Sequence, residues 1–134
     1  MIIDSHCHLT YKPMSSSLDE TIERASNDGV KYLLTISTED KSFRNILDII
    51  EKYRSVYGTY GIHPHEAKKH LEIKSNHIIN QVRKSKKIIG IGETGLDFYY
   101  NHSDKDKQIN SFREHIEASI QTEMPIIVHS RNAE

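Results

Sequence analysis

The sequence predicts an α/β fold in which about five parallel strands alternate with four helices. Five short apolar runs are separated by four segments of helical periodicity. Several of the apolar runs are continuous, as expected for strands buried on both faces. This alternation is typical of a parallel sheet with right-handed crossovers. We expect strands over residues 1–3, 32–36, 56–62, 88–91 and 126–128.

The four helices are predicted from apolar residues that recur every three or four positions. The residues that define them are Leu18, Ile22 and Ala25; Phe43, Ile46, Leu47 and Ile50; Leu71, Ile78 and Val82; and Ile109, Phe112, Ile116 and Ile120. The third set is the weakest. Gly29 is expected to end the first helix, and residues 103–106 to cap the fourth.

Length and composition limit the classes of protein to consider. A chain of 134 residues forms at most one domain, over residues 1–134. Its 36% apolar and 28% charged residues suit a soluble globular protein. A net charge of −1 provides no basic field over the whole surface to attract nucleic acid. The single cysteine, Cys7, fits a reducing compartment, and the absence of a signal peptide or membrane span favours the cytoplasm.

Polar side chains follow each predicted strand. Because parallel strands bring their carboxyl ends to one edge, that edge is where ligands bind in such folds. The residues placed there include His6 and His8, Glu39, His63 and His65, Glu93 and Asp97, and His129 and Arg131. The basic run at residues 83–87 precedes a strand, so it is expected at the opposite end, where a solvated turn is favoured over a phosphate patch.

His6 and His8 are two residues apart, so their imidazoles would leave the first strand on the same side. Two converging imidazoles are a good beginning for a divalent-metal site, although two exposed polar residues at a strand end would give the same spacing. Asp4 could orient one imidazole. Cys7, between the two histidines, would point to the other face and is interpreted as a small buried residue rather than a nucleophile.

Glu93 directly follows the apolar, glycine-containing run at residues 88–92. A carboxylate in that position must be paired, metal-bound or exposed at a cleft. Its two oxygens could bridge two ions about 3.5–4 Å apart, as in enzymes that hydrolyse phosphoesters. A salt-bridged or helix-capping glutamate is the alternative.

The remaining polar residues at this edge allow several roles. His129 could be structural or catalytic, and Arg131 offers a guanidinium suited to phosphate. His63 and His65 could bind metal, donate protons or contact phosphate, or could simply lie in a stiff loop. Asp97 could position a water or ligand, or form a turn.

Five segments, in this order, resemble the TatD family of metal-dependent deoxyribonucleases. They are IIDSHCHL, YGIHPHEA, GIGETGLDFYY, QINSFREHIEAS and MPIIVHSRNAE. The resemblance covers the whole chain and implies a TIM-type (β/α)8 barrel, DNA as substrate, and two divalent metal ions, whether Mg, Mn or Zn. It implies that metal is bound by His6, His8, Glu93 and His129, that Glu93 is the catalytic bridging residue, and that substrate phosphate is contacted by His63 and Arg131.

A full barrel takes about 250 residues. The resemblance therefore implies the N-terminal half only, with a later histidine and a catalytic aspartate of the family outside these residues. We expect open sheet edges, impaired or absent activity of the isolated chain, and either pairing with a separate C-terminal half-barrel or oligomerisation. Two alternatives remain at this point: a C–N bond hydrolase of the amidohydrolase type, and a non-catalytic half-barrel.

Overall fold

Strands and helices alternate along the whole chain. The structure is a computed structural model that describes residues 1–134. The strands are β1 Ile2–Cys7, β2 Val30–Thr35, β3 Val56–Tyr60, β4 Ile88–Asp97 and β5 Ile126–Arg131. The α-helices are α1 Leu18–Asn27, α2 Phe43–Lys52, α3 Ser75–Val82 and α4 Lys105–Thr122, and short 3-10 segments cover Met14–Ser16, Asp40–Ser42 and Pro64–Lys69. None of these helices combines the length and apolar character that a membrane span requires.

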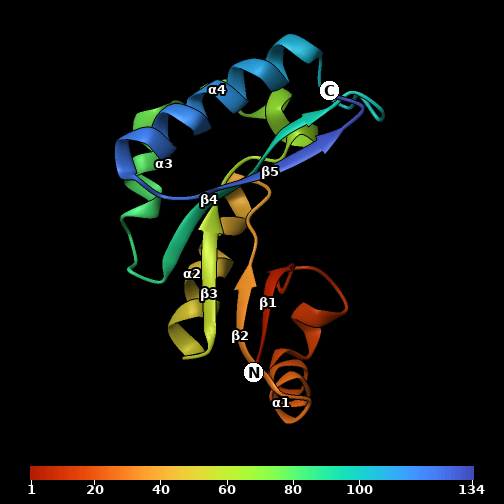
Figure 1. Ribbon diagram of the computed structural model, residues 1–134, viewed down its shortest axis with the longest axis vertical. Coiled ribbons are helices and arrows are strands. Elements are labelled where there is room, and N and C mark those ends of the chain that lie inside the picture. Colours follow the sequence, from red (N-terminus) through yellow and green to blue (C-terminus); the bar gives the residue numbers. More distant parts are fainter.

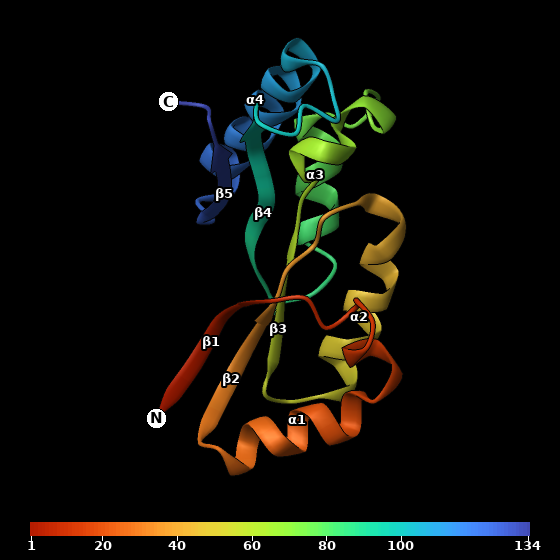
Figure 2. The same ribbon diagram turned by 90° about the vertical axis from the view of Figure 1, so that its right-hand side faces the viewer.

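The five strands form one parallel sheet whose spatial order is the chain order, β1-β2-β3-β4-β5. The sheet curls, and the helices cover one of its faces (Figure 1, Figure 2). This is the N-terminal half of a TIM-type barrel, so the predicted fold class is confirmed. β1 and β5 each pair on one side only, which leaves two open edges.

The hydrophobic core lies between the sheet and its helices. Leu33, Val56 and Ile88 enter it from three strands, and Ile46 and Ile78 from α2 and α3. Side chains alternate along a strand, so the residues next to these core positions point to the helix-free face. On that face Tyr32 and Ile89 are 44% and 43% exposed. The helix-free face therefore presents apolar side chains that nothing in this chain covers.

Three strands extend further than their apolar runs predicted. β1 includes His6, β4 continues through Glu93 to Asp97, and β5 includes His129. Most of the polar residues expected beyond these strands lie within them, because the β1–β2 and β4–β5 ladders continue past the apolar residues, whereas His8 follows β1. β2 and β3 end one and two residues earlier than predicted, and Leu71 lies outside α3 rather than on its buried face.

Helix α4 forms where predicted, but the expected burial of its apolar stripe is wrong. Its buried residues are Gln108, His115 and Ala118, whereas Ile116 and Ile120 are 38% and 67% exposed. The polar face turns inward because its side chains bond backbone groups of neighbouring segments. No following helix covers the exposed isoleucines beside edge strand β5.

The basic run at residues 83–87 lies just ahead of β4, at the opposite end of that strand from Glu93 and Asp97. The Lys87 ammonium donates hydrogen bonds to the carbonyls of Ile50 and Tyr53, at 2.5 and 2.7 Å. It thereby satisfies orphan carbonyls at the end of α2. This geometry favours the structural role of the run over a phosphate patch.

Candidate metal centre

Three strands aim metal-ligating side chains at one point. His6 Nε2, on β1, lies 3.5 Å from Glu93 Oε2, on β4. The other oxygen of the same carboxylate, Oε1, lies 3.2 Å from Nδ1 of His129, on β5. Glu93 is 9% exposed and stands between the two imidazoles, as a bridging carboxylate would. The parallel sheet thus gathers residues that are far apart in sequence.

His8 completes a group with His6 and Glu93, whose ligand atoms all lie within 4.8 Å of one another. Burial lowers the pKa of His8, which favours the neutral form that binds metals. The Nδ1 atom of His8 is buried and has no hydrogen-bond partner in the protein. A buried polar atom of this kind needs a partner. Two imidazoles and a carboxylate with an unsatisfied nitrogen fit a divalent cation.

The residues beside this histidine pair have structural roles. Asp4 accepts a hydrogen bond from the backbone N–H of His6 at 3.1 Å, so it fixes the strand rather than an imidazole. The Cys7 thiol donates to the carbonyl of Leu34, and burial, with Asp4 nearby, raises its pKa to about 12. Such a thiol is a poor nucleophile at neutral pH, in agreement with its interpretation as a packing residue.

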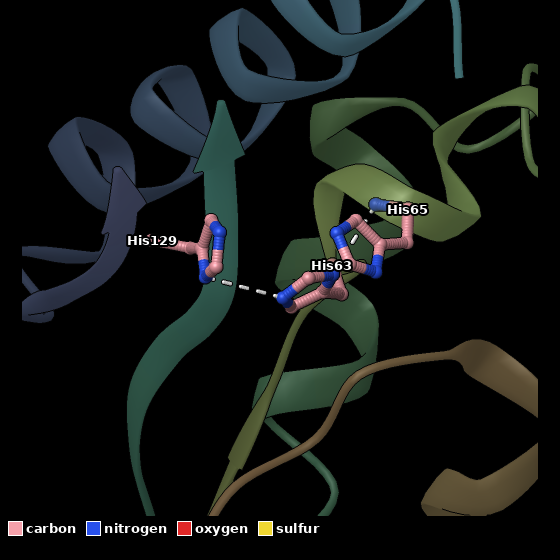
Figure 3. A group of neighbouring side chains, drawn as sticks. All are labelled: His63, His65 and His129. Carbon is pink, nitrogen blue, oxygen red and sulfur yellow. Dashed lines mark hydrogen bonds between the residues drawn. The ribbon is translucent and has the colours of Figure 1, made fainter. Parts of the chain in front are cut away.

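A second group consists of His63, His65 and His129 (Figure 3). His63 caps the 3-10 segment that follows β3, and its Nδ1 accepts a hydrogen bond from the backbone N–H of His65 at 3.2 Å. Its Nε2 lies 3.3 Å from Nδ1 of His129 and 4.0 Å from Glu93. Burial, with His65 and His129 close by, lowers the pKa of His63 to about 3. His63 is therefore neutral at physiological pH.

Asp97 lies behind this group and is fully buried. Its Oδ2 is 2.7 Å from Nε2 of His65 and 3.0 Å from Nε2 of His129, and its Oδ1 accepts from the backbone N–H of Tyr100 at 2.9 Å. Burial opposes ionisation, but these hydrogen bonds outweigh it and hold the pKa of Asp97 below its usual range. Asp97 thus forms the turn that the sequence allowed and also contacts two imidazoles.

Two residues of α4 that the sequence analysis did not single out hold this site from behind. Gln108 accepts from the backbone N–H of Asp97 at 2.7 Å and donates to its carbonyl at 3.1 Å. His115 accepts from the backbone N–H of Ile62 at 3.0 Å and donates through Nδ1 to the carbonyl of Ser111 at 2.7 Å. Their seven-residue spacing places them on one helix face, but polar residues with this spacing are equally typical of a solvent-exposed face, so the sequence held no signal that set them apart.

Acid is expected to destabilise the chain through His115. Burial lowers its folded pKa from 6.5 to about 4. Between these values the unfolded state binds the extra proton, so the stabilisation is present above pH 6.5 and is lost as pH falls toward 4. Lowering the pH from 7.5 to 5 should cost about 2 kcal/mol through this group. Urea unfolding of wild type and His115→Gln at both pH values measures it. Equal pH dependence in the two proteins would contradict the assignment.

The two groups line one cleft of about 350 Å³. His8, His63, Glu93 and His129 form part of its wall, together with Arg131. The Arg131 guanidinium lies 5.0 Å from the ring centroid of a neighbouring tyrosine, a cation–π distance. The two residues predicted to contact phosphate, His63 and Arg131, therefore share a cavity with three of the four predicted metal ligands, and His6 contacts Glu93 from beside it.

Comparison with known proteins agrees with this geometry. The family model described as "TatD related DNase" matches residues 3–134. An uncharacterized metal-dependent hydrolase of Buchnera aphidicola is 39% identical, and the match covers 98% of this chain and 53% of that protein. The "3'-5' ssDNA/RNA exonuclease TatD" of Salmonella typhimurium is 27% identical over 98% of this chain and 50% of its own length.

A solved structure gives the same result. YjjV, a TatD homologue from Escherichia coli, superposes with a TM-score of 0.80 at 29% identity, over 98% of this chain and 51% of YjjV. The chain thus spans about half the length of the relatives it matches. Because the family model matches nearly every residue, this chain belongs to the TatD-related DNase family, and the Buchnera relative is named a metal-dependent hydrolase.

Proposed function

We propose that this chain carries the N-terminal part of a metal-dependent site that hydrolyses DNA phosphodiester bonds. The convergence of three imidazoles on one nearly buried carboxylate supports this function. His6, His8 and Glu93 would hold one divalent ion, and Glu93 with His129 would hold a second. Imidazole and carboxylate ligands suit Mg, Mn or Zn. DNA is the proposed substrate because the Salmonella relative is named as a nuclease that acts on single-stranded DNA and RNA.

Divalent ions at this site would supply a bound water of lowered pKa and would neutralise charge on a phosphate. The chain's own residues would orient the reactants. Glu93 directs one oxygen toward His6 and the other toward His129, so one carboxylate would serve both proposed groups of ligands. Arg131 would bind phosphate oxygens with paired N–H groups at the wall of the cleft. His63, neutral and within the same cleft, would donate a hydrogen bond to phosphate.

The proposal includes a second half-barrel, on the same polypeptide or on another. The relatives are about twice as long, β1 and β5 have unpaired edges, and Tyr32 and Ile89 are exposed on the helix-free face. A second set of strands would pair both edges and cover this face. We propose the cytoplasm as its location, because the one cysteine, Cys7, is unpaired.

The test is to assay cleavage of a single-stranded DNA oligonucleotide with Mg²⁺ or Mn²⁺. The 134-residue chain alone should show little or no turnover. The chain mixed with the complementary half of the Buchnera relative should cleave DNA, and EDTA should abolish the activity. Size measurement must show the mixed complex, because a dimer of two identical chains is the competing outcome.

The same mixture is assayed with a cyclic amide, so that C–N bond hydrolysis is distinguished from DNA cleavage. A stable complex of both halves that leaves DNA intact would contradict the proposal that DNA is the substrate. Strong turnover by the chain alone would show that the site needs no second half.

A further inference from the structure

The three-histidine group looks like a metal site by distance alone, but its hydrogen bonds assign a different role. We propose that Asp97 is a positioning residue that fixes the tautomer of His129, in register with the tautomer that the backbone N–H of His65 fixes for His63. In this arrangement His63 has no free nitrogen for a cation, and His129 keeps its Nδ1 lone pair directed at the Glu93 side. The effect on metal binding rests on the proposed function, whereas the tautomers follow from the hydrogen bonds alone.

The proton order follows from one donor that cannot be reversed. The backbone N–H of His65 can only donate, so Nδ1 of His63, 3.2 Å away, must be the acceptor. A neutral imidazole carries one proton, so that of His63 lies on Nε2. That N–H faces Nδ1 of His129 at 3.3 Å. Nδ1 of His129 is then the acceptor, and the His129 proton lies on Nε2.

Asp97 accepts the hydrogen bond at the end of this chain of donors and acceptors. Its Oδ2 is 3.0 Å from Nε2 of His129 and 2.7 Å from Nε2 of His65, and an ionised carboxylate only accepts. The Oδ1 atom of Asp97 already accepts from a backbone N–H, and the Gln108 side chain bonds both the backbone N–H and the backbone C=O of Asp97. A fully buried carboxylate held at this many points cannot turn to suit another tautomer. His129 therefore donates to Asp97.

These tautomers give His63 and His129 different roles. His63 has one nitrogen accepting and the other donating, so it presents an N–H rather than a lone pair, which suits contact with phosphate oxygen. His129 Nδ1 accepts from His63 and lies 3.2 Å from Glu93 Oε1, so its lone pair is the only one of these two rings that faces the Glu93 carboxylate. A cation bound by this lone pair would take the place of the His63 N–H. A carboxylate that holds the far nitrogen of a metal-binding imidazole typically raises metal affinity about 10–100-fold.

Histidine side-chain NMR on the metal-free chain at pH 8 tests the tautomers directly, with nitrogen and carbon shifts that separate Nε2–H from Nδ1–H. His63 and His129 should both show the Nε2–H form. His115 is an internal reference of the opposite kind, because its Nδ1 donates to a carbonyl and its Nε2 accepts from a backbone N–H. An Nδ1–H tautomer at either His63 or His129 overturns the proposal.

The variant Asp97→Asn carries the test further, since its amide cannot accept all three hydrogen bonds. It should shift His129 away from the Nε2–H form and weaken Mn²⁺ binding about 10–100-fold. Asp40→Asn is the matched control, because Asp40 contacts Nε2 of His77 at 3.0 Å away from this cleft. The control should leave His129 and Mn²⁺ affinity as in wild type.

Unchanged His129 signals in folded Asp97→Asn would overturn the positioning role. If that variant does not fold, the wild-type tautomers decide alone. Correct tautomers in a complex that leaves DNA intact would refute the proposed function and leave this inference standing.

Discussion

Glu93→Gln is expected to abolish measurable Mn²⁺ binding. The Glu93 carboxylate contacts imidazoles on both sides, at 3.5 Å from His6 and 3.2 Å from His129, so both proposed ion positions lose their anionic ligand together. Loss of a partner that only supports a ligand costs roughly 10–100-fold in affinity, and loss of a shared ligand should cost more. Isothermal titration calorimetry with Mn²⁺ measures the change.

The fold should survive this substitution, because glutamine has nearly the same shape and Glu93 takes no part in the hydrophobic core. Glu114→Gln serves as the control. Glu114 accepts a hydrogen bond from the backbone N–H of Ser75 at 2.8 Å, outside the cleft, and its variant should bind Mn²⁺ like wild type. Wild-type affinity in folded Glu93→Gln would remove the basis for a bridging carboxylate.

The positions of the candidate ligands could be predicted from the sequence because they depend on a simple regularity. An apolar run followed by polar residues marks the end of a buried parallel strand, and all such ends meet at one edge. His6, Glu93 and His129 were expected together for that reason, and the structure brings them together. The strand ends were misplaced because hydrogen bonding between β4 and β5 continues beyond the apolar residues that made the strands visible.

The support behind the site could not be predicted in the same way. His115 bonds Ile62, which is 53 positions away, and Gln108 bonds the backbone of Asp97 across the turn that follows β4. A polar residue on a helix is usually solvent-exposed, and only the tertiary arrangement shows that these two are buried and satisfied. The apolar stripe of α4 misled for the same reason, since local periodicity does not say which helix face meets the sheet.

Gly92→Ala is expected to destabilise the chain by about 3 kcal/mol or more. Gly92 has φ +135°, where L-residues are strained, and a Cβ there would lie 2.5 Å from the carbonyl oxygen of Ile127. The obstacle is the backbone of β5, which cannot move aside without breaking its ladder with β4. Because Gly92 precedes Glu93, relief of the clash would also displace the carboxylate, so Mn²⁺ affinity should fall with stability.

Gly29→Ala separates backbone strain from steric clash as causes of the destabilisation expected for Gly92→Ala. Gly29 also has positive φ, +91°, but a Cβ there meets no atom within 4 Å. It should cost only the backbone strain, about 1–2 kcal/mol, and leave Mn²⁺ affinity unchanged. Urea unfolding of both variants compares them. Equal losses would mean that strain alone accounts for Gly92 and that β4 and β5 can separate by several tenths of an ångström. In that case the close approach of the two strands would not be what holds Glu93 beside His129.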